Sequence, residues 1–344
     1  MKKILRIGTR DSQLAVWQAT FVKNELVKHG IASELVLIKS DGDIDLVTPL
    51  YEIGVQGVFT KTLDAALLSD KIDIAVHSMK DVPTQLAKGI QQAAVLKRAN
   101  YKDILVLHPD IDIRDNHFSI NSVTVTKTEN GKKLREHDRW TLPLREDPSN
   151  PGKPEKICIA TSSVRRIAQW KNRFPDSIIE NLRGNVNTRL KKLKESDWHG
   201  AIFAAAGLER INLRPEHSIE LDWMLPAPAQ GAIMIVCREN DTESKNKSAL
   251  LNDETTAICT KIERDFLRTL MGGCSTPISA LAEIKKEKIY FKCSILSLDG
   301  NEKAETDYSG FLLKDSFDLG ITAANYILEN GGRQIVENIR NAGI

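Results

Sequence analysis

The most distinctive chemistry in the sequence lies in a basic segment that runs from residue 165 to residue 194. It holds nine lysines and arginines against two acidic residues, although the whole chain has 48 basic and 46 acidic residues and a net charge of only +2. Guanidinium groups bind carboxylates and phosphates through two parallel hydrogen bonds. Four arginines stand beside expected strand ends and therefore predict a polyanionic ligand, whereas the lysines near the end of the segment are interpreted as a solvated helix face. The four are Arg165, Arg166, Arg183 and Arg189.

Two short motifs beside these arginines offer further groups to an anion. Thr161, Ser162 and Ser163 lie between an expected strand and an expected helix, where hydroxyl groups and free backbone N–H groups bind anions. Gly184 follows Arg183 and allows the backbone to approach a ligand closely. A structural role for the arginines stays open at this point, but an anion-binding site is the favoured interpretation.

A lysine and a carboxylate, Lys80 and Asp81, follow the apolar segment 72–78. The pair is either a structural ion pair or a functional site in which Asp81 stabilises positive charge that develops on a nitrogen-containing substrate. His77 precedes them and is interpreted as a core residue, because a single histidine in an apolar strand is usually structural.

Cys274 differs from the other cysteines by its surroundings. It stands in the loop sequence Gly-Gly-Cys-Ser-Thr-Pro, whereas the other four lie in apolar or helical runs and are interpreted as buried thiols. A loop thiol near arginines shifts toward thiolate and becomes a nucleophile. The five cysteines form no CxxC pair, so we expect neither a disulfide framework nor a metal site.

These residues must be positioned by alternating strands and helices, which predict a mostly parallel sheet with helices on its faces. Ligands of such sheets bind beyond the carboxyl ends of the strands. The first unit has expected strands at 3–8, 32–39 and 72–78 and helices at 14–26 and 59–69. The second has strands at 156–160, 177–182 and 198–206 and helices at 163–170 and 187–195. A strand at 230–237 and a helix at 255–270 follow, and then a small α+β unit with a strand at 289–295 and a helix at 316–328.

The composition narrows the class of protein. A chain of 344 residues suits two or three domains, and 41% hydrophobic with 27% charged residues is typical of a globular protein. No apolar run is long enough for a membrane span, and the near-neutral charge disfavours a nucleic-acid binder. We therefore expect a cytoplasmic protein without membrane or nucleic-acid partners.

The segment from about 110 to 155 is rich in proline and lacks periodicity, so it is interpreted as an insertion with a hairpin around Asn130-Gly131.

Seven motifs, in order along nearly the whole chain, resemble those of the hydroxymethylbilane synthase (porphobilinogen deaminase) family. They are Arg6–Arg10, His77–Pro83, Thr161–Ser163 with the two arginines that follow, Leu182–Val186, Ala206–Leu208, Gln230-Gly231 and Gly272–Cys274. The resemblance implies two α/β domains like those of type II periplasmic binding proteins and a small C-terminal α+β domain. The expected boundaries are 1–98 with 226–248, 99–225, and 249–344.

The resemblance also implies an activity and a cofactor. It implies a monomeric transferase of porphyrin biosynthesis that joins four porphobilinogen molecules head to tail, releases one ammonia at each step, and finally frees linear hydroxymethylbilane with water. Cys274 aligns with the cysteine that carries the dipyrromethane cofactor through a thioether, and Asp81 aligns with the catalytic aspartate. The aligned cofactor-binding residues are Ser78, Lys80, Asp81, Thr161, Ser163, Arg165, Arg166, Arg183, Gly184 and Arg189. The aligned substrate-binding residues are Arg10, Ser12, Gln18, Arg183, Arg189 and Arg210.

The sequence departs from the family pattern at one position. Gln56 stands in a glycine-containing loop where the family often has lysine, so no role is carried over to it.

Two other classes of protein remain as alternatives. One is a non-catalytic two-lobed module that binds anions with the same arginines, and the other is a nucleic-acid binder that uses the basic segment.

Overall fold

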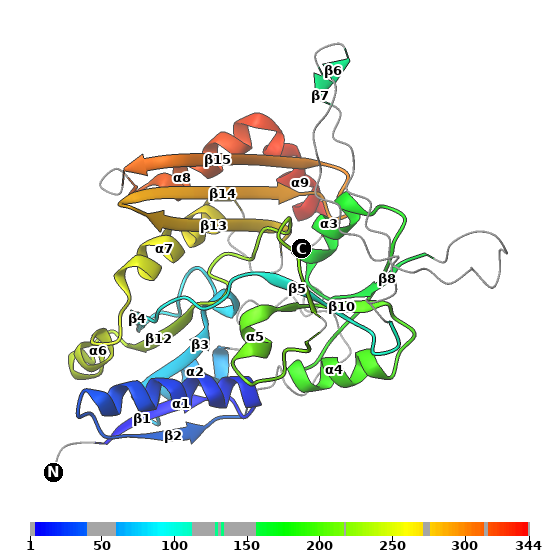
Figure 1. The fold of residues 1–344 in the computed structure, drawn as a ribbon. Coiled ribbons are helices and arrows are strands. Elements are labelled where there is room, and N and C mark those ends of the chain that lie inside the picture. Colours follow the sequence, from blue (N-terminus) through cyan, green and yellow to red (C-terminus); the bar gives the residue numbers. More distant parts are fainter. Residues whose placement is uncertain are drawn as a thin grey trace.

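The computed structural model describes residues 4–39, 60–111, 128–129, 132–133, 156–216, 218–270, 276–312 and 316–342. Cys274, Gln56 and most of the expected insertion lie outside these residues. The strands form two five-stranded sheets, one three-stranded sheet and one two-stranded hairpin (Figure 1). The expected fold class, two α/β units with a smaller α+β unit, is confirmed.

The first sheet contains four strands that run in one direction and one that runs against them. Its order is β2 (Ser33–Leu37), β1 (Leu5–Thr9), β3 (Ile74–Ser78), β12 (Ile233–Arg238) and β4 (Ile90–Val95), and β12 is antiparallel to both neighbours. Helix α1 (Gln13–Lys28) packs on one face through Val22 and Leu26, and α2 (Lys61–Leu68) packs on the other through Leu63 and Leu67. We call this sheet and its helices the first lobe.

The second sheet repeats this arrangement. Its order is β9 (Ile178–Glu180), β8 (Cys158–Ala160), β10 (Gly200–Ala204), β5 (Asp103–Leu107) and β11 (Ser218–Glu220), and β5 is the antiparallel strand. The helices are α3 (Val164–Arg173), α4 (Val186–Lys194) and α5 (Ala205–Glu209). We call this unit the second lobe. In each lobe the reversed strand lies fourth, between the third and the last.

The two reversed strands are those next to the connections between the lobes. The chain leaves the first lobe after β4 and enters β5, and it returns from β11 to β12. At the return, Gly231 has φ +87, and an added Cβ would lie 2.7 Å from the carbonyl oxygen of Ala99 on the outgoing connection. The two connecting segments therefore pack closely and only glycine fits at this point.

The C-terminal unit packs helices on one antiparallel sheet. Strands β13 (Ile278–Lys285), β14 (Lys288–Leu296) and β15 (Lys303–Leu312) pair in sequence order. Helices α7 (Glu254–Leu270), α8 (Leu319–Ile327) and α9 (Arg333–Asn341) share one buried cluster with the sheet, while α6 (Thr242–Ala249) leads from β12 to α7. A short π-helical turn, Leu328–Gly332, joins α8 to α9.

Two local expectations can be compared with the structure. The hairpin around residues 130–131 is confirmed, because β6 (Thr128–Glu129) pairs antiparallel with β7 (Lys132–Lys133). The strand expected at 198–206 is too long: β10 ends at Ala204 and α5 begins at the next residue. The small residues of the Ala-Ala-Gly sequence after this strand permit the abrupt change from strand to helix, which periodicity could not locate.

Candidate active site

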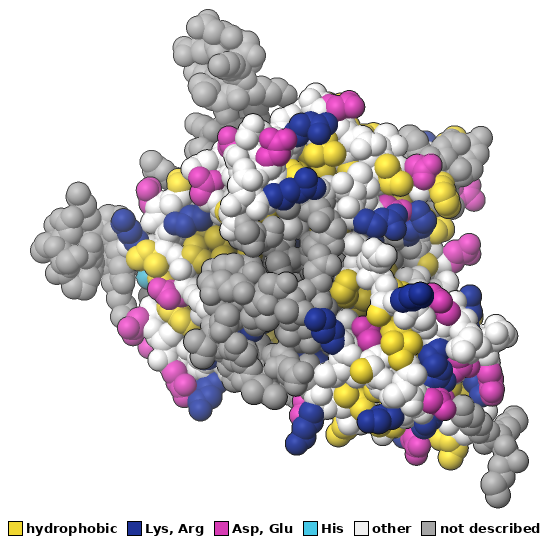
Figure 2. All heavy atoms as spheres, turned by 180° about the vertical axis from the view of Figure 1, so that it is seen from behind, with side chains coloured by type: hydrophobic (Ala, Val, Ile, Leu, Met, Phe, Trp, Pro, Cys, Tyr) yellow, Lys and Arg dark blue, Asp and Glu magenta, His cyan; other side chains and the backbone are white. Residues whose placement is uncertain are grey.

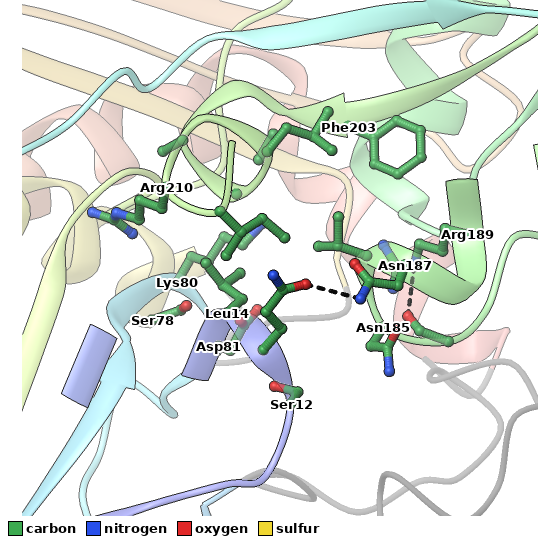
Figure 3. Close-up of a pocket in the computed structure, with 18 of the residues that line it drawn as sticks. Ser12, Leu14, Ser78, Lys80, Asp81, Asn185, Asn187, Arg189, Phe203 and Arg210 are labelled. Atoms are coloured by element: carbon green, nitrogen blue, oxygen red, sulfur yellow. Dashed lines mark hydrogen bonds between the residues drawn. The ribbon is translucent and has the colours of Figure 1, made fainter. Parts of the chain in front are cut away.

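A cavity of about 480 Å³ lies between the two lobes (Figure 3). On the first lobe its wall comes from the turn between β1 and α1 and from the short 3₁₀ turn Met79–Asp81 that follows β3. On the second lobe it comes from the start of α4, the end of β10 and α5. Both walls thus include the carboxyl ends of strands, where the alternating pattern places ligands.

The wall of the first lobe carries Arg10, Ser12, Ser78, Lys80 and Asp81. Ser12 caps α1 and accepts a hydrogen bond from the N–H of Ala15 at 3.4 Å, which fixes the turn that presents Arg10. The sequence places Lys80 and Asp81 in the short 3₁₀ turn because Pro83 prevents β3 from continuing. Figure 3 shows Ser78, Lys80 and Asp81 together on this wall.

The wall of the second lobe is built on the start of α4. Gly184 has φ +111, and an added Cβ would lie 2.7 Å from Thr188, so the turn requires glycine. Asn185 caps the helix by accepting from the N–H of Thr188 at 2.9 Å. Arg189 donates from Nε to the carbonyl oxygen of Gly184 at 2.7 Å, which holds its guanidinium at the cavity. Arg183, 4% exposed, lines the same wall.

Asp103 organises the two adjacent arginines of α3, and sequence reasoning missed it. This carboxylate is fully buried and binds Nη2 of Arg165 and Nη2 of Arg166, each at 2.7 Å. Burial alone would raise its pKa, but the two guanidinium groups outweigh burial and hold the pKa at about 2. Gln230 on the returning connection donates to the same carboxylate at 2.9 Å. No pattern in the sequence marks Asp103 apart from its place at the start of an apolar run.

The structure brings most of the expected site residues to the cavity wall. Those that line it are Arg10, Ser12, Ser78, Lys80, Asp81, Arg166, Arg183, Gly184, Arg189 and Arg210. Four others, Gln18, Thr161, Ser163 and Arg165, are not among the residues that line it. Gln18 donates to the Ser78 hydroxyl at 2.9 Å, and Arg165 donates to the carbonyl oxygen of Leu225 at 2.7 Å as well as to Asp103. Gln18 thus contacts a wall residue and Arg165 contacts Asp103, and the expected direct roles of all four stay predictions.

Burial weakens the basicity of several cations at the wall. Burial lowers the pKa of Lys80 to about 8, although Asp81 partly opposes the shift. Burial likewise lowers the pKa of Arg189 to about 10 and that of Arg210 to about 10. All three are therefore charged at neutral pH but incompletely solvated, and an anionic ligand would replace the water that they have lost.

Two side chains of the second lobe, Asn187 and Arg210, contact the first lobe or the connection between the lobes. The Asn187 amide on α4 donates to Gln13 on α1 at 2.9 Å, as Figure 3 shows. Arg210 donates to the carbonyl oxygen of Gly231 at 2.7 Å, and its guanidinium carbon lies 5.8 Å from the ring centre of Trp17 on α1. The cavity is thus bounded by both lobes at once.

The ionisable groups of the wall are mainly basic. Six cationic side chains and two carboxylates line the cavity, and the carboxylates are Asp11 and Asp81. This arrangement suits a ligand that carries several carboxylates and that also has a positively charged centre, next to which the protein places a carboxylate. The fold and the site thus define a two-lobed α/β protein with an anion-binding cavity between its lobes.

Comparisons with known proteins give the family. The model of the porphobilinogen deaminase dipyrromethane cofactor-binding domain matches residues 5–246, and that of the porphobilinogen deaminase C-terminal domain matches residues 257–329. The porphobilinogen deaminase of Chlorobium phaeobacteroides is 35% identical over 347 residues, and that of Desulforamulus reducens is 36% identical over 344; each alignment covers 99% of both chains. The chain belongs to the porphobilinogen deaminase family. Its members are transferases that polymerise pyrroles, and the cofactor expected from the sequence is the one for which the matched domain is named.

Solved structures include more distant likenesses. The methionine-binding protein MetQ is 13% identical with a TM-score of 0.38, covering 72% of this chain and 89% of that one. An ancestral cationic amino-acid solute-binding protein is 14% identical with the same TM-score, covering 72% and 87%. Likenesses at this level say nothing about the ligand or the activity of this chain.

Proposed function

We propose that the protein is a hydroxymethylbilane synthase. It condenses four porphobilinogen molecules head to tail on a covalently bound dipyrromethane primer, releases ammonia at each step, and frees linear hydroxymethylbilane by hydrolysis. The observation that carries the proposal is the cavity itself. In a chain of this family, six cationic side chains line one cavity together with Asp81.

The residues of the cavity fit a dipyrromethane. Each pyrrole ring of this group carries an acetate and a propionate, so the cofactor is a polycarboxylate and needs several cations. Arg166, Arg183, Arg189 and Lys80 supply them from both walls. When bound, the cofactor provides the pyrrole carbon to which the first substrate is joined.

We propose Cys274 as the attachment point. Helix α7 ends at Leu270, and Cys274 follows four residues later, outside the described part of the chain. A thioether needs a single accessible thiol. Of the described cysteines, Cys237, Cys259 and Cys293 are buried and Cys158 is partly buried. In Cys259 and Cys293, burial raises the pKa of the thiol, to about 12 in Cys259, which makes both poor nucleophiles.

Asp81 is proposed as the catalytic carboxylate. It is exposed on the cavity wall beside Lys80, and the ionisable groups of this wall are mainly basic. Loss of ammonia from the substrate leaves positive charge on the pyrrole. A carboxylate that accepts hydrogen bonds from pyrrole N–H groups stabilises this charge more in the transition state than in the ground state. The surrounding arginines hold the carboxylates of the substrate in position, which contributes orientation.

Three further residues are proposed to bind substrate from the mouth of the cavity. Arg10 and Ser12 lie on one lobe and Arg210 on the other, so a substrate that touches all three bridges the lobes.

The alternative of a non-catalytic anion-binding module leaves Asp81 without a role and does not account for the family. The expectations of a cytoplasmic monomer without nucleic-acid or membrane partners remain predictions; among the described residues no helix is both long and apolar enough to cross a membrane.

Intact-protein mass spectrometry tests the cofactor proposal. The purified protein should carry the extra mass of one dipyrromethane unit, and Cys274→Ser should lack it, because serine forms no thioether. Cys158→Ser is the matched control, since Cys158 is the least buried of the described cysteines, and it should keep the extra mass. An unmodified wild-type protein that converts porphobilinogen with full activity would contradict the proposal.

The Asp81→Asn variant tests the catalytic proposal separately. It should keep the extra mass, since asparagine keeps the shape of the turn, but its rate of ammonia release should fall by about a hundredfold or more, as when other charge-stabilising groups are removed. Stopped or continuous assays of porphobilinogen consumption measure the rate. A rate within a fewfold of wild type would show that Asp81 is not the catalytic carboxylate.

A further inference from the structure

A small recess opens from the main cavity beside Asp81. It has a volume of about 60 Å³, and it shares Arg10, Leu14, Ser78 and Asp81 with the cavity wall, so the two spaces adjoin. Its deeper lining includes Gln18 and His77. We propose that this recess, the side recess, receives the ammonia that each condensation releases. The inference rests on the function proposed above.

The size of the side recess limits what can enter it. A water molecule occupies about 30 Å³ in the liquid, and ammonia is of similar size. A pyrrole ring with its acetate and propionate arms is several times larger than the recess. Of the species in the proposed reaction, only ammonia and water are small enough to enter, and ammonia is the one produced at every condensation next to Asp81.

The polar groups of the recess match a small molecule that both donates and accepts hydrogen bonds. Gln18 is 2% exposed, and its amide is held by the Ser78 hydroxyl at 2.9 Å. His77 is 7% exposed, and its Nε2 atom has no hydrogen-bond partner among the described residues. A buried polar atom of this kind is costly unless a ligand satisfies it. Together with the Asp81 carboxylate, these groups form hydrogen-bonding walls on several sides.

The charges of the recess favour neutral ammonia over ammonium. Burial, assisted by Arg10, lowers the pKa of His77 to about 4, so its imidazole is neutral at ordinary pH. Arg10 brings one positive charge to the lining and Asp81 one negative charge, and no other ionisable residue lines the described recess. The two charges cancel, so the lining suits a neutral ligand, and ammonia offers it three N–H donors and one lone pair.

The condensation step releases ammonia in its neutral form. The C–N bond of the protonated aminomethyl group breaks and its electron pair stays on nitrogen, so ammonia leaves and positive charge remains on the pyrrole next to Asp81. A new C–C bond then forms to the terminal pyrrole of the growing chain, and the proton on the attacked carbon is lost. Moving ammonia away from the reacting carbon prevents it from adding back.

Inhibition by added ammonium chloride tests the proposal. Rates of porphobilinogen consumption are measured at one pH, with potassium chloride keeping the ionic strength constant. The ammonia in equilibrium with ammonium chloride should slow the wild type by filling the side recess. His77→Leu, which replaces the imidazole by an apolar group, should need about fivefold more for the same inhibition, the effect of one lost hydrogen bond.

Three comparisons complete the experiment. His77→Gln keeps a polar group and should retain most of the sensitivity, and His108→Leu, at the end of β5 and outside both spaces, should retain all of it. Trimethylammonium chloride, too large for the recess, should inhibit the wild type much less than ammonium. Cofactor mass and circular dichroism identify any variant that fails to fold. If His77→Leu fails to fold, the comparison of the two salts on the wild type carries the test, and equal inhibition by trimethylammonium and ammonium would contradict the proposal.

Two outcomes overturn the inference without touching the proposed function. Equal ammonium sensitivity in wild type and His77→Leu would show that ammonia acts elsewhere. A variant with slower release of hydroxymethylbilane but unchanged ammonium sensitivity would assign the recess to the hydrolytic water. A wild type that releases no ammonia from porphobilinogen would instead contradict the proposed function.

Discussion

The cationic side chains at the cavity wall and next to it differ chiefly in which carboxylate neutralises them. Arg165 and Arg166 have a carboxylate partner in Asp103, which two buried cations share. Lys80 has only partial compensation from Asp81, and burial has the larger effect on its pKa. Lys80 is therefore the cation of the wall whose charge depends on pH within the range where enzymes are assayed.

Substrate binding should weaken as Lys80 loses its proton. The lysine is charged below its pKa of about 8 and neutral above it, so its attraction for carboxylates falls as pH rises. We expect KM for porphobilinogen to increase above this pH, approaching about tenfold per pH unit if Lys80 dominates binding. Lys80→Arg stays charged and should abolish the increase. An identical pH profile in the variant would assign the titration to another group.

The lowered pKa of Lys80 affects the stability of the fold in the opposite direction. The pKa of Lys80 is lower in the folded protein than the ordinary value of 10.5, so the unfolded chain binds more protons between about 8 and 10.5. The contribution of this group to the free energy of unfolding therefore increases with pH across that window. Binding and stability thus respond in opposite directions to the same proton.

Some of these roles could be predicted from the residue types and their positions, and others could not. Arginines after strand ends and a carboxylate after a strand were recognisable, because such side chains are costly to place there without a partner or a ligand. Asp103 was not, because its partners lie 62 and 63 positions away in the sequence and only folding brings them together.

Among the elements, α7 connects more of the site than any expectation from the sequence suggested. Arg264 on this helix donates to the carbonyl oxygens of Val82 at 2.9 Å and Pro83 at 2.6 Å. It also reaches the carbonyl oxygen of Met79 at 3.4 Å. The turn that presents Lys80 and Asp81 is thus held by a helix of the C-terminal unit, and the same helix leads to the loop of Cys274.

Arg264→Met should remove the hydrogen bonds that hold the turn with Lys80 and Asp81, and it should therefore lower kcat with little change in KM. A displacement of about 1 Å in a catalytic group costs up to about a hundredfold in rate. Arg268→Met is the matched control, because Arg268 on the same helix is 54% exposed and pairs only with Asp265 among the contacts described. Steady-state kinetics with verified cofactor mass measure the effect. A rise in KM at constant kcat would show that Arg264 acts on binding instead of positioning Asp81.

Helices and strands with clear periodicity were predicted within a few residues, as with α1, α2, α3 and β3. Strands β4, β5 and β11 were not anticipated. The fully buried β5, with the sequence Asp-Ile-Leu-Val-Leu, shows no alternation of polar and apolar residues, since both of its faces are covered. Strand β11 has only three residues and offers too short a pattern to detect.

At the scale of the whole molecule, Glu263 ties the three units together. Its fully buried carboxylate accepts from Arg98 Nη1 at 2.6 Å on the outgoing connection. It accepts from the N–H of Ala229 at 2.6 Å on the returning connection, and from the N–H of Ala282 at 2.8 Å on β13. The two connections between the lobes and the C-terminal sheet therefore meet at one carboxylate.

Glu263→Gln should lower the free energy of unfolding by about 3–5 kcal/mol, because it leaves the charge of Arg98 without its buried partner and turns an amide NH₂ toward backbone donors. Glu305→Gln, which removes a surface ion pair with Lys303, should cost about 1 kcal/mol or less. Urea unfolding followed by circular dichroism measures both. A loss for Glu263→Gln no greater than that of the surface control would show that the connections are held by other contacts.

The distribution of charge also belongs to this scale. On the face shown in Figure 2, basic and acidic side chains are intermixed, so the surplus of the basic segment does not form a patch of one sign there. Several of its arginines instead point into the cavity or onto Asp103. A near-neutral sum over the chain therefore conceals a strongly basic interior surface.

Motifs, periodicity and the positions of strand ends are local properties of the chain, and they were enough to predict the family, the fold class and the kinds of groups in the site. How those groups act depends on the tertiary structure. It placed Arg166 but not Arg165 among the residues that line the cavity, supplied Asp103 and Arg264 from distant segments, and buried Lys80 enough to lower its pKa. Burial and long-range pairing depend on which segments meet in space, and no pattern of neighbouring residues encodes that.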